Sequence, residues 1–301
     1  MWILLAFLSA ALLGCYDVFK KTSLKDNAVL PVLMINTVVC ALFFVPLIVQ
    51  SFVAADSVMP VGDLRTHGFV FVKSIIVLSS WVCGYFAMKH LPLTIVGPIN
   101  ATRPVMTLVG ALLIFGERLN LWQWAGVVLA LVSIYLLSCS SKREGIRFAH
   151  NRWVVFLVAA AVLGAASGLY DKHLLSPVEM GGVGLDRMFV QGWYNVYQAL
   201  LMTIVILSIW LPIRRKSTPF QWRWSILFIS LFLTAADMAY FYALSEPGAM
   251  ISVVSMVRRS SVVVSFLFGA FYFREKNLRA KAFDLVLIML GMLCLYIGTT
   301  S

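Results

Sequence analysis

The sequence is poor in charged residues. Asp, Glu, Lys and Arg together make up 12% of its 301 residues, whereas soluble domains carry about 25%. The charges stand in short clusters between long apolar runs, and 61% of the chain is hydrophobic. So few charges cannot cover so much apolar surface in water. The composition therefore excludes a soluble globular protein and indicates a membrane protein.

Residues that bind metals or form disulfides are also few and scattered. The four histidines stand in four separate predicted loops, and the five cysteines lie inside apolar runs without Cys-x-x-Cys spacing. We therefore expect no metal site, no cofactor and no disulfide. A membrane enzyme acting on lipid phosphates would need clustered His, Asp or Glu side chains, so it is kept only as a distant alternative. The sequence has no nucleotide-binding loop, which excludes ATP as the direct energy source.

Long apolar runs are what the chain does have. A transmembrane helix needs about 20 mainly apolar residues, and the sequence contains ten runs of roughly this length. We predict an all-α, polytopic fold with ten transmembrane helices, in a multi-pass protein of a bacterial inner (plasma) membrane. The runs cover about residues 2–20, 28–53, 68–88, 93–115, 121–141, 153–175, 187–211, 223–244, 248–273 and 279–299.

The basic residues gather in alternate loops. Sixteen follow the first, third, fifth, seventh and ninth runs, among them Lys20 and Lys281, and five follow the other runs, among them Lys73. Because cytoplasmic loops are enriched in Lys and Arg, this bias predicts that both termini lie outside. It also accounts for the formal net charge of +11 without a nucleic-acid partner. Three arginines remain inside apolar runs, namely Arg103, Arg258 and Arg259.

The two halves of the chain resemble each other. The segment "GCYDVFKK", with Asp17, is matched by "GLYDKHLL", with Asp171, and "FGERLN", with Glu117, returns as "FREKNL", with Glu275. Five spans in each half is an odd number, so the second half is expected to be inverted in the membrane. Inverted repeats place a binding site near the bilayer midplane and support alternating access. The predicted repeats are residues 1–147 and 148–301.

These features resemble the drug/metabolite transporter superfamily, and especially its EamA-like members, which have ten helices in two five-helix repeats with Gly-Glu-Arg-type endings. Arg258 and Arg259 are similar to a basic pair of the plastid sugar-phosphate translocators, which binds the substrate phosphate there. Those translocators carry a lysine where this chain has Asn100, and Arg103 lies one turn away. An EamA-like chain usually begins with a basic cytoplasmic N-terminus, which leaves the opposite orientation open.

Polar residues recur at helical spacing in five of the runs, which predicts polar faces around a wet central cavity. Asp237 is expected to neutralise one intramembrane arginine, which leaves two without a protein partner. Guanidinium groups bind phosphate and carboxylate through paired hydrogen bonds, so the arginines indicate an anion site. The predicted substrate-binding residues are Asn36, Trp81, Tyr85, Asn100, Arg103, Gln191, Asn195, Gln198, Arg258 and Arg259. Their faces extend to Thr107, Gly110, Ser252 and Ser255.

Structural roles are the alternative for several of these residues. The asparagines Asn36 and Asn195 could hydrogen-bond neighbouring helices, and the aromatic residues could be ordinary core side chains. Asp237 could be only a counter-ion for an arginine. Asp17 is expected to pair locally with Lys20 or Lys21 near a helix end.

The sequence thus favours a secondary transporter of a small organic anion, either a phosphorylated or a carboxylated metabolite. Asp237 is the predicted proton-coupling residue, because it is the acid placed to carry a proton. The alternative is an exporter of neutral or zwitterionic metabolites such as amino acids or drugs. The expected partners are a small anionic substrate and the lipid bilayer, and the oligomeric state is left open.

Overall fold

The computed structural model describes residues 2–53, 59–103, 105–106, 120–142, 151–175, 178–215, 218–245, 257–273 and 278–300. Thr107, Gly110, Glu117, Ser252, Ser255 and Glu275 lie outside these residues. In chain order the elements are α1 (Trp2–Leu24), α2 (Val29–Val53), α3 (Leu64–His90), α4 (Leu93–Ala101), α6 (Leu121–Lys142), α7 (Arg152–Leu175), the 3₁₀ turn η2 (Val178–Met180), α8 (Arg187–Val205), the π-helical segment η3 (Ile206–Trp210), α9 (Leu211–Ile213), α10 (Ser225–Ser245), α12 (Ser261–Phe271) and α13 (Leu278–Thr300).

The predicted all-α fold is confirmed. Within the described ranges there are ten successive helical spans, counting α8, η3 and α9 as one rod. Five helices in these ranges are long and apolar enough to cross a membrane by length and composition: Val29–Val53, Leu64–His90, Arg152–Leu175, Arg187–Ile213 and Lys281–Gly298.

Large apolar side chains cover the outside of the bundle. Leu4, Phe52 and Phe271 are 74%, 60% and 79% exposed. Dozens of such side chains in contact with water would make the protein insoluble, whereas lipid is their natural surrounding. The protein is therefore an integral, multi-pass membrane protein.

Side chains outside the apolar spans fix where two helices begin. Asp63 accepts a hydrogen bond from the backbone N–H of Thr66, whose hydroxyl in turn accepts from the backbone N–H of Asp63, and this capping box starts α3. The hydrogen bonds from Thr66 hold the pKa of Asp63 below its usual range. Asp186 caps α8 by accepting from the N–H of Phe189 at 2.9 Å. Both caps satisfy N–H groups that lack a partner within the helix.

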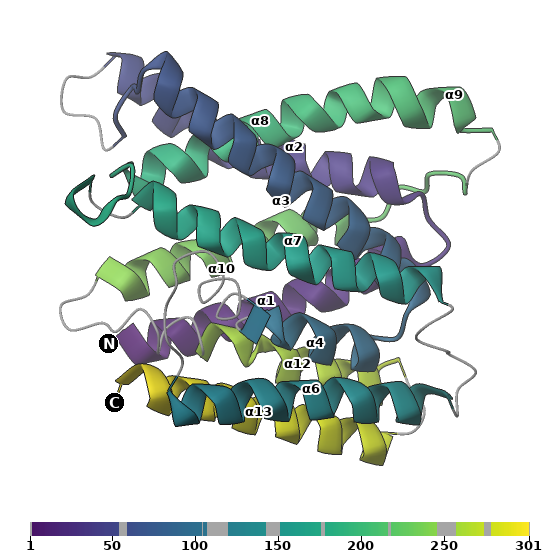
Figure 1. Ribbon diagram of the computed structural model, residues 1–301. Helices are drawn as coiled ribbons and strands as arrows, with labels where there is room; N and C mark the ends of the chain where they lie inside the picture. Colours follow the sequence, from purple (N-terminus) through teal and green to yellow (C-terminus); the bar gives the residue numbers. More distant parts are fainter. Residues whose placement is uncertain are drawn as a thin grey trace.

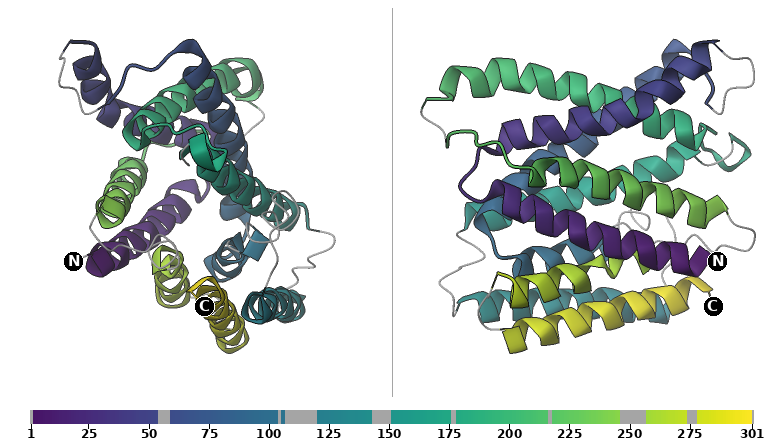
Figure 2. Two further views of the ribbon diagram at one scale, coloured as in Figure 1. Left: turned by 60° about the vertical axis from the view of Figure 1, so that its left-hand side comes forward. Right: turned by 180° about the vertical axis from the view of Figure 1, so that it is seen from behind.

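The long helices run side by side, and both termini lie at the same end of the bundle (Figures 1 and 2). In the bundle α1 packs along α10, α3 along α7, α2 along α8 and α6 along α13. The pairings are reciprocal: the first span of each half packs along the third span of the other half.

Two hydrogen bonds from hydroxyl groups follow the same reciprocal pairing of the halves. Ser74 of α3 donates to the backbone carbonyl of Tyr194 in α8 at 3.3 Å. Ser230 of α10 donates to the backbone carbonyl of Asn36 in α2, also at 3.3 Å. Third and second spans of opposite halves are thus joined in the same way twice, as two repeats of one sequence pattern would be.

Candidate functional site

Arg258 forms an ion pair inside the bundle. It belongs to a turn of helix at residues 257–259, just before α12, and its guanidinium group pairs with the carboxylate of Asp237 in α10. The side chains are 22% and 16% exposed. The Arg258 Cζ also lies 4.4 Å from the centre of the Tyr240 ring, within the range of a cation–π contact. The structure therefore brings Asp237 to one of the predicted arginines.

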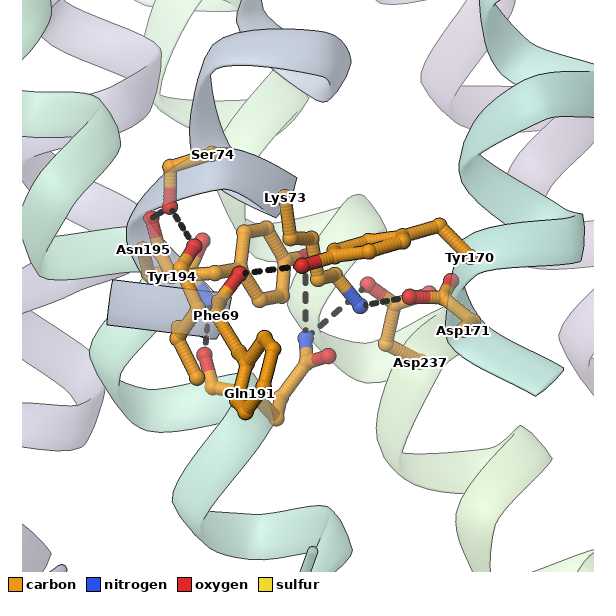
Figure 3. Close-up of polar contacts among 10 residues, drawn as sticks. Phe69, Lys73, Ser74, Tyr170, Asp171, Gln191, Tyr194, Asn195 and Asp237 are labelled. Atoms are coloured by element: carbon orange, nitrogen blue, oxygen red, sulfur yellow. Dashed lines mark hydrogen bonds and ion pairs between the residues drawn. The ribbon is translucent and has the colours of Figure 1, made fainter. Parts of the chain in front are cut away.

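Gln191 of α8 extends this pair toward the centre of the bundle. Its Nε2 lies 3.4 Å from the second carboxylate oxygen of Asp237 and 3.2 Å from the hydroxyl oxygen of Tyr194 (Figure 3). Asn195 donates from Nδ2 to the backbone carbonyl of Gln191 at 2.8 Å. Of the predicted site residues, Gln191, Asn195 and Asp237 thus share one hydrogen-bonded group with Arg258.

Lys73 is also in this group, and its predicted place in a loop is wrong. α3 begins at Leu64, so Lys73 lies more than two turns inside the helix and is 7% exposed. Its Nζ is 2.6 Å from a carboxylate oxygen of Asp171 in α7 and 4.7 Å from the centre of the Tyr194 ring (Figure 3). A charge count along the sequence assigns a single lysine near the start of an apolar run to the preceding loop, although here it lies inside the helix. Its buried counter-ion comes from another helix.

Arg103 lies two residues beyond the end of α4, and its guanidinium group fits against Gly164 of α7. A Cβ atom added to Gly164 would be 2.9 Å from the Arg103 Cζ. Asp17 of α1 interacts electrostatically with Arg103 and Lys20, and Ser265 donates to its carboxylate at 3.0 Å.

The expected local ion pair of Asp17 at a helix end is therefore incomplete as an account of that residue. So is the expectation that Asp237 is the single acid deep in the bundle. Asp17 and Asp171 stand at matching places in the two repeats; Asp17 interacts electrostatically with Arg103, and Asp171 forms an ion pair with Lys73 of a neighbouring helix. Their shared Tyr-Asp motif in the sequence was the signal that could have identified both as site residues.

Arg259 differs from the other cations of the site. It is half-buried, and its electrostatic neighbours are Arg103, Arg258 and Tyr240. In the part of the chain that the structure describes, no hydrogen bond or ion pair joins Arg259 to an acid. A charge with so little water and two like charges beside it is costly without an anion.

The remaining predicted residues lie in helix contacts. Asn36 is fully buried and accepts a hydrogen bond from the Ser230 hydroxyl at 3.0 Å, which matches its alternative role between helices. Gln198 is fully buried in α8, and Asn100 is half-buried one turn before Arg103. Trp81 and Tyr85 pack in the largest apolar cluster of the bundle.

Two more lysines that were counted in loops are buried within helices. Lys281 of α13 is fully buried and donates to the Thr94 hydroxyl at 2.9 Å. Lys20 of α1 is 8% exposed, with its Nζ 4.2 Å from the centre of the Tyr85 ring. Removing these two from sixteen leaves fourteen, and removing Lys73 from five leaves four. The charge bias keeps its direction, and the orientation stays a prediction.

No group of three or more His, Cys, Asp and Glu side chains that could hold a metal ion occurs among the described residues. The site is instead made of charged side chains on α1, α3, α7, α10, the residues just after α4 and the turn before α12, together with neutral polar side chains of α8. Such a group can bind an ionised molecule and exchange its own ion pairs for contacts with that molecule.

Comparisons with known proteins agree with this architecture. A protein of Archaeoglobus fulgidus described as an uncharacterized transporter is 22% identical over 302 residues, which is 96% of this chain and 97% of that protein. An uncharacterized protein of Methanocaldococcus jannaschii is 24% identical over 139 residues, covering 46% of this chain and 97% of its own length. That relative is therefore about the size of one half of this chain.

A solved crystal structure shares the fold, with a TM-score of 0.58 and 17% sequence identity over 97% of this chain and 95% of its own. The model of the EamA-like transporter family matches residues 1–139 and again 151–297. The two matches together span nearly the whole sequence. This family consists of transporters and not of enzymes. The chain belongs to the EamA-like transporter family.

Proposed function

We propose that the protein is a secondary transporter of a small organic anion, which binds between the helices at Arg259 and Arg103. The observation that carries the proposal is the position of Arg259 among two other arginines, without an acid of the described residues beside it. A phosphate or carboxylate would supply the missing negative charge and accept paired hydrogen bonds from the guanidinium groups.

Arg258 has a different role from Arg259 in this proposal. Because Asp237 already neutralises it, Arg258 becomes available to a substrate only when that ion pair opens. A proton on Asp237 would release Arg258, so protonation and anion binding would favour each other. This supports Asp237 as the proton-coupling residue and predicts that proton and anion move in the same direction.

The resemblance to the sugar-phosphate translocators is consistent with these different roles of Arg258 and Arg259. Their basic pair corresponds to Arg258 and Arg259, while the lysine of their fourth helix is replaced here by Asn100. Arg103, held against Gly164, provides a cation one turn further along. The substrate is accordingly a phosphorylated or carboxylated metabolite, and the proposed location is a prokaryotic plasma membrane.

The acids of the site favour one further candidate, a zwitterion. Asp237 and Asp171 flank Gln191 and Lys73 in the same group of side chains (Figure 3). An amino acid could place its carboxylate on Arg259 and its ammonium group on one of these acids. Export of neutral or zwitterionic metabolites is therefore the second proposal.

A thermal-shift screen of purified protein separates the two. Organic phosphates, dicarboxylates and amino acids are tested against wild type and Arg259→Gln, because a ligand that binds the folded state raises the melting temperature. Anion transport predicts stabilisation by phosphates or dicarboxylates that Arg259→Gln removes. Stabilisation by amino acids alone supports the zwitterion. Stabilisation by anions that persists in Arg259→Gln contradicts the proposed site.

A further inference from the structure

At the end of the bundle away from the termini, a lysine of α1 donates hydrogen bonds to the end of α3, and a lysine of α3 donates one to the loop after α1. Lys21, in the last turn of α1, donates from Nζ to the backbone carbonyls of Met88, at 2.7 Å, and Leu91. Lys89, in the last turn of α3, donates to the backbone carbonyl of Asn27, which follows α1, at 2.9 Å. The last carbonyls of a helix lack internal partners and carry the negative end of its dipole. Lys21 therefore binds the C-terminal end of α3, to which a cation is best suited, while Lys89 binds the loop between α1 and α2.

The end of α1 is also fastened to the segment that leads into α10. The side chain of Asn27 donates to the carbonyl of Gln221 and accepts from its N–H, both at 2.8 Å. Ser23 donates to the hydroxyl of Ser225 at 2.7 Å. Residues 218–223 form no regular helix, and Asn27, which follows α1, supplies partners for both backbone groups of Gln221. The segment runs beside the turn between α1 and α2 in the right-hand view of Figure 2.

Lys89 binds both parts of this fastened unit. Besides the carbonyl of Asn27, it donates to the hydroxyl of Thr218 at 2.9 Å. In the rest of the bundle α1 packs along α10 and α3 packs along α7, while α1 and α3 meet over a short stretch. The two lysines thus add polar contacts between two helix pairs whose buried side chains Leu24, Met88 and Leu91 belong to one apolar cluster at this end.

We propose that Lys21 and Lys89 form a latch that closes this mouth of the transporter and opens once in each transport cycle. Alternating access requires that the helix pairs separate at one mouth at a time. The lysine–carbonyl bonds suit this step because water can replace the carbonyl groups when the mouth opens. The proposal rests on the membrane-transporter assignment and does not depend on the identity of the substrate.

The repeat makes the latch specific for one mouth. Asp17 and Asp171 are 154 residues apart, and the matching segments "YFAM" at Tyr85 and "FYAL" at Phe241 are 156 residues apart. At these offsets the counterparts of Lys21 and Lys89 at the other mouth are Leu175 and Ser245. Neither residue is a cation, so the second repeat cannot form the same crossed pair. The two mouths of the protein would therefore open with different ease, although the repeats share one fold.

The test uses Cys40, which is 2% exposed and lies in α2 beside Thr234 at the centre of the bundle. The other four cysteines are replaced by serine. The labelling rate of Cys40 by a membrane-impermeant methanethiosulfonate is measured in right-side-out and inside-out vesicles. Arg215→Cys, at an exposed position near the latch, identifies which vesicle face carries this mouth. We expect Lys21→Met and Lys89→Met each to accelerate labelling about tenfold, equivalent to about 1.4 kcal/mol, from that face only.

Lys25→Met is the matched control, because Lys25 is an exposed lysine at the same end of α1. It should leave the labelling rate unchanged. Equal labelling in wild type and both latch variants, or an increase from both faces, overturns the proposal. Should the lysine variants not fold, Thr218→Val removes a single acceptor and should accelerate labelling two- to threefold; an unchanged rate then overturns it. The measurement contains no substrate, so a failed anion site would leave its result intact.

Discussion

Gly164 is the residue at which the geometry gives the sharpest prediction. A Cβ atom at this position would lie 2.9 Å from Cζ and Nη1 and 3.0 Å from Nε of Arg103. Ordinary contacts begin at about 3.5 Å, so Gly164→Ala must push the guanidinium group away or separate α4 from α7. Extra atoms in a packed interior lower the free energy of unfolding by about 1–3 kcal/mol. The lower end applies if the flexible end of Arg103 moves aside, and the upper end if its attraction to Asp17 holds it in place. The gain from replacing a helical glycine is about 0.5–1 kcal/mol.

In the wild-type background we therefore expect Gly164→Ala to range from nearly neutral to about 2.5 kcal/mol destabilising. In the Arg103→Ala background the clash is gone, so the same change should stabilise by about 0.5–1 kcal/mol. The coupling between the two positions should then equal the clash, about 1–3 kcal/mol. Unfolding in mixed detergent micelles, followed by tryptophan fluorescence, measures these free energies.

Gly68→Ala is the matched control, because Gly68 lies in α3 and a Cβ there meets nothing within 4 Å. It should be neutral to stabilising whether or not Arg103 is present. If Gly164→Ala changed the free energy of unfolding equally in the wild-type and Arg103→Ala backgrounds, the Arg103 guanidinium group would not lie against Gly164. If the anion site is correct, Gly164→Ala should also weaken anion binding, since it displaces one of the site's cations.

Three further predictions concern the charges of the bundle, and a fourth concerns its orientation in the membrane. Arg259→Gln should leave the melting temperature unchanged or higher and weaken anion binding by about 1.5–3 kcal/mol. Arg258→Gln should lower the melting temperature, because it leaves Asp237 without its ion-pair partner. Equal melting temperatures of the two variants would contradict their different pairing. Asp237→Asn should abolish proton-driven uptake and spare substrate exchange in proteoliposomes, and unchanged uptake would remove Asp237 from coupling. Asp171→Asn should lower the free energy of unfolding by about 1–3 kcal/mol, less than the 3–5 kcal/mol lost on breaking fully buried pairs, because 34% of its side chain is exposed. The double change Lys73→Met with Asp171→Leu should restore most of that stability, and no recovery would argue against the pair. A C-terminal reporter that is active only in the cytoplasm should be silent, and strong activity would reverse the predicted orientation.

The charge assignments show where sequence reasoning reaches its limit. Asp237 was expected to neutralise one of the intramembrane arginines, and the structure pairs it with Arg258. Lys73 was assigned to a loop, and Asp171 was treated only as part of a repeated motif. In the structure the two form the second ion pair of the site. Depth along a helix can be read from the chain, but the rotation of that helix against its neighbours cannot.

The sequence by itself determined the medium, the number of spans and the repeat. Apolar runs of about 20 residues have to satisfy their backbone groups as helices in lipid, and the order of matching motifs marks two halves. Which helices pair was decided by the tertiary structure, since side-chain packing across helices joins α1 to α10 and α3 to α7. The same packing brings Gly164 to Arg103, Asp171 to Lys73 and Lys21 to the end of α3. These contacts join residues far apart in sequence, and no local pattern encodes them because each depends on where two helices cross.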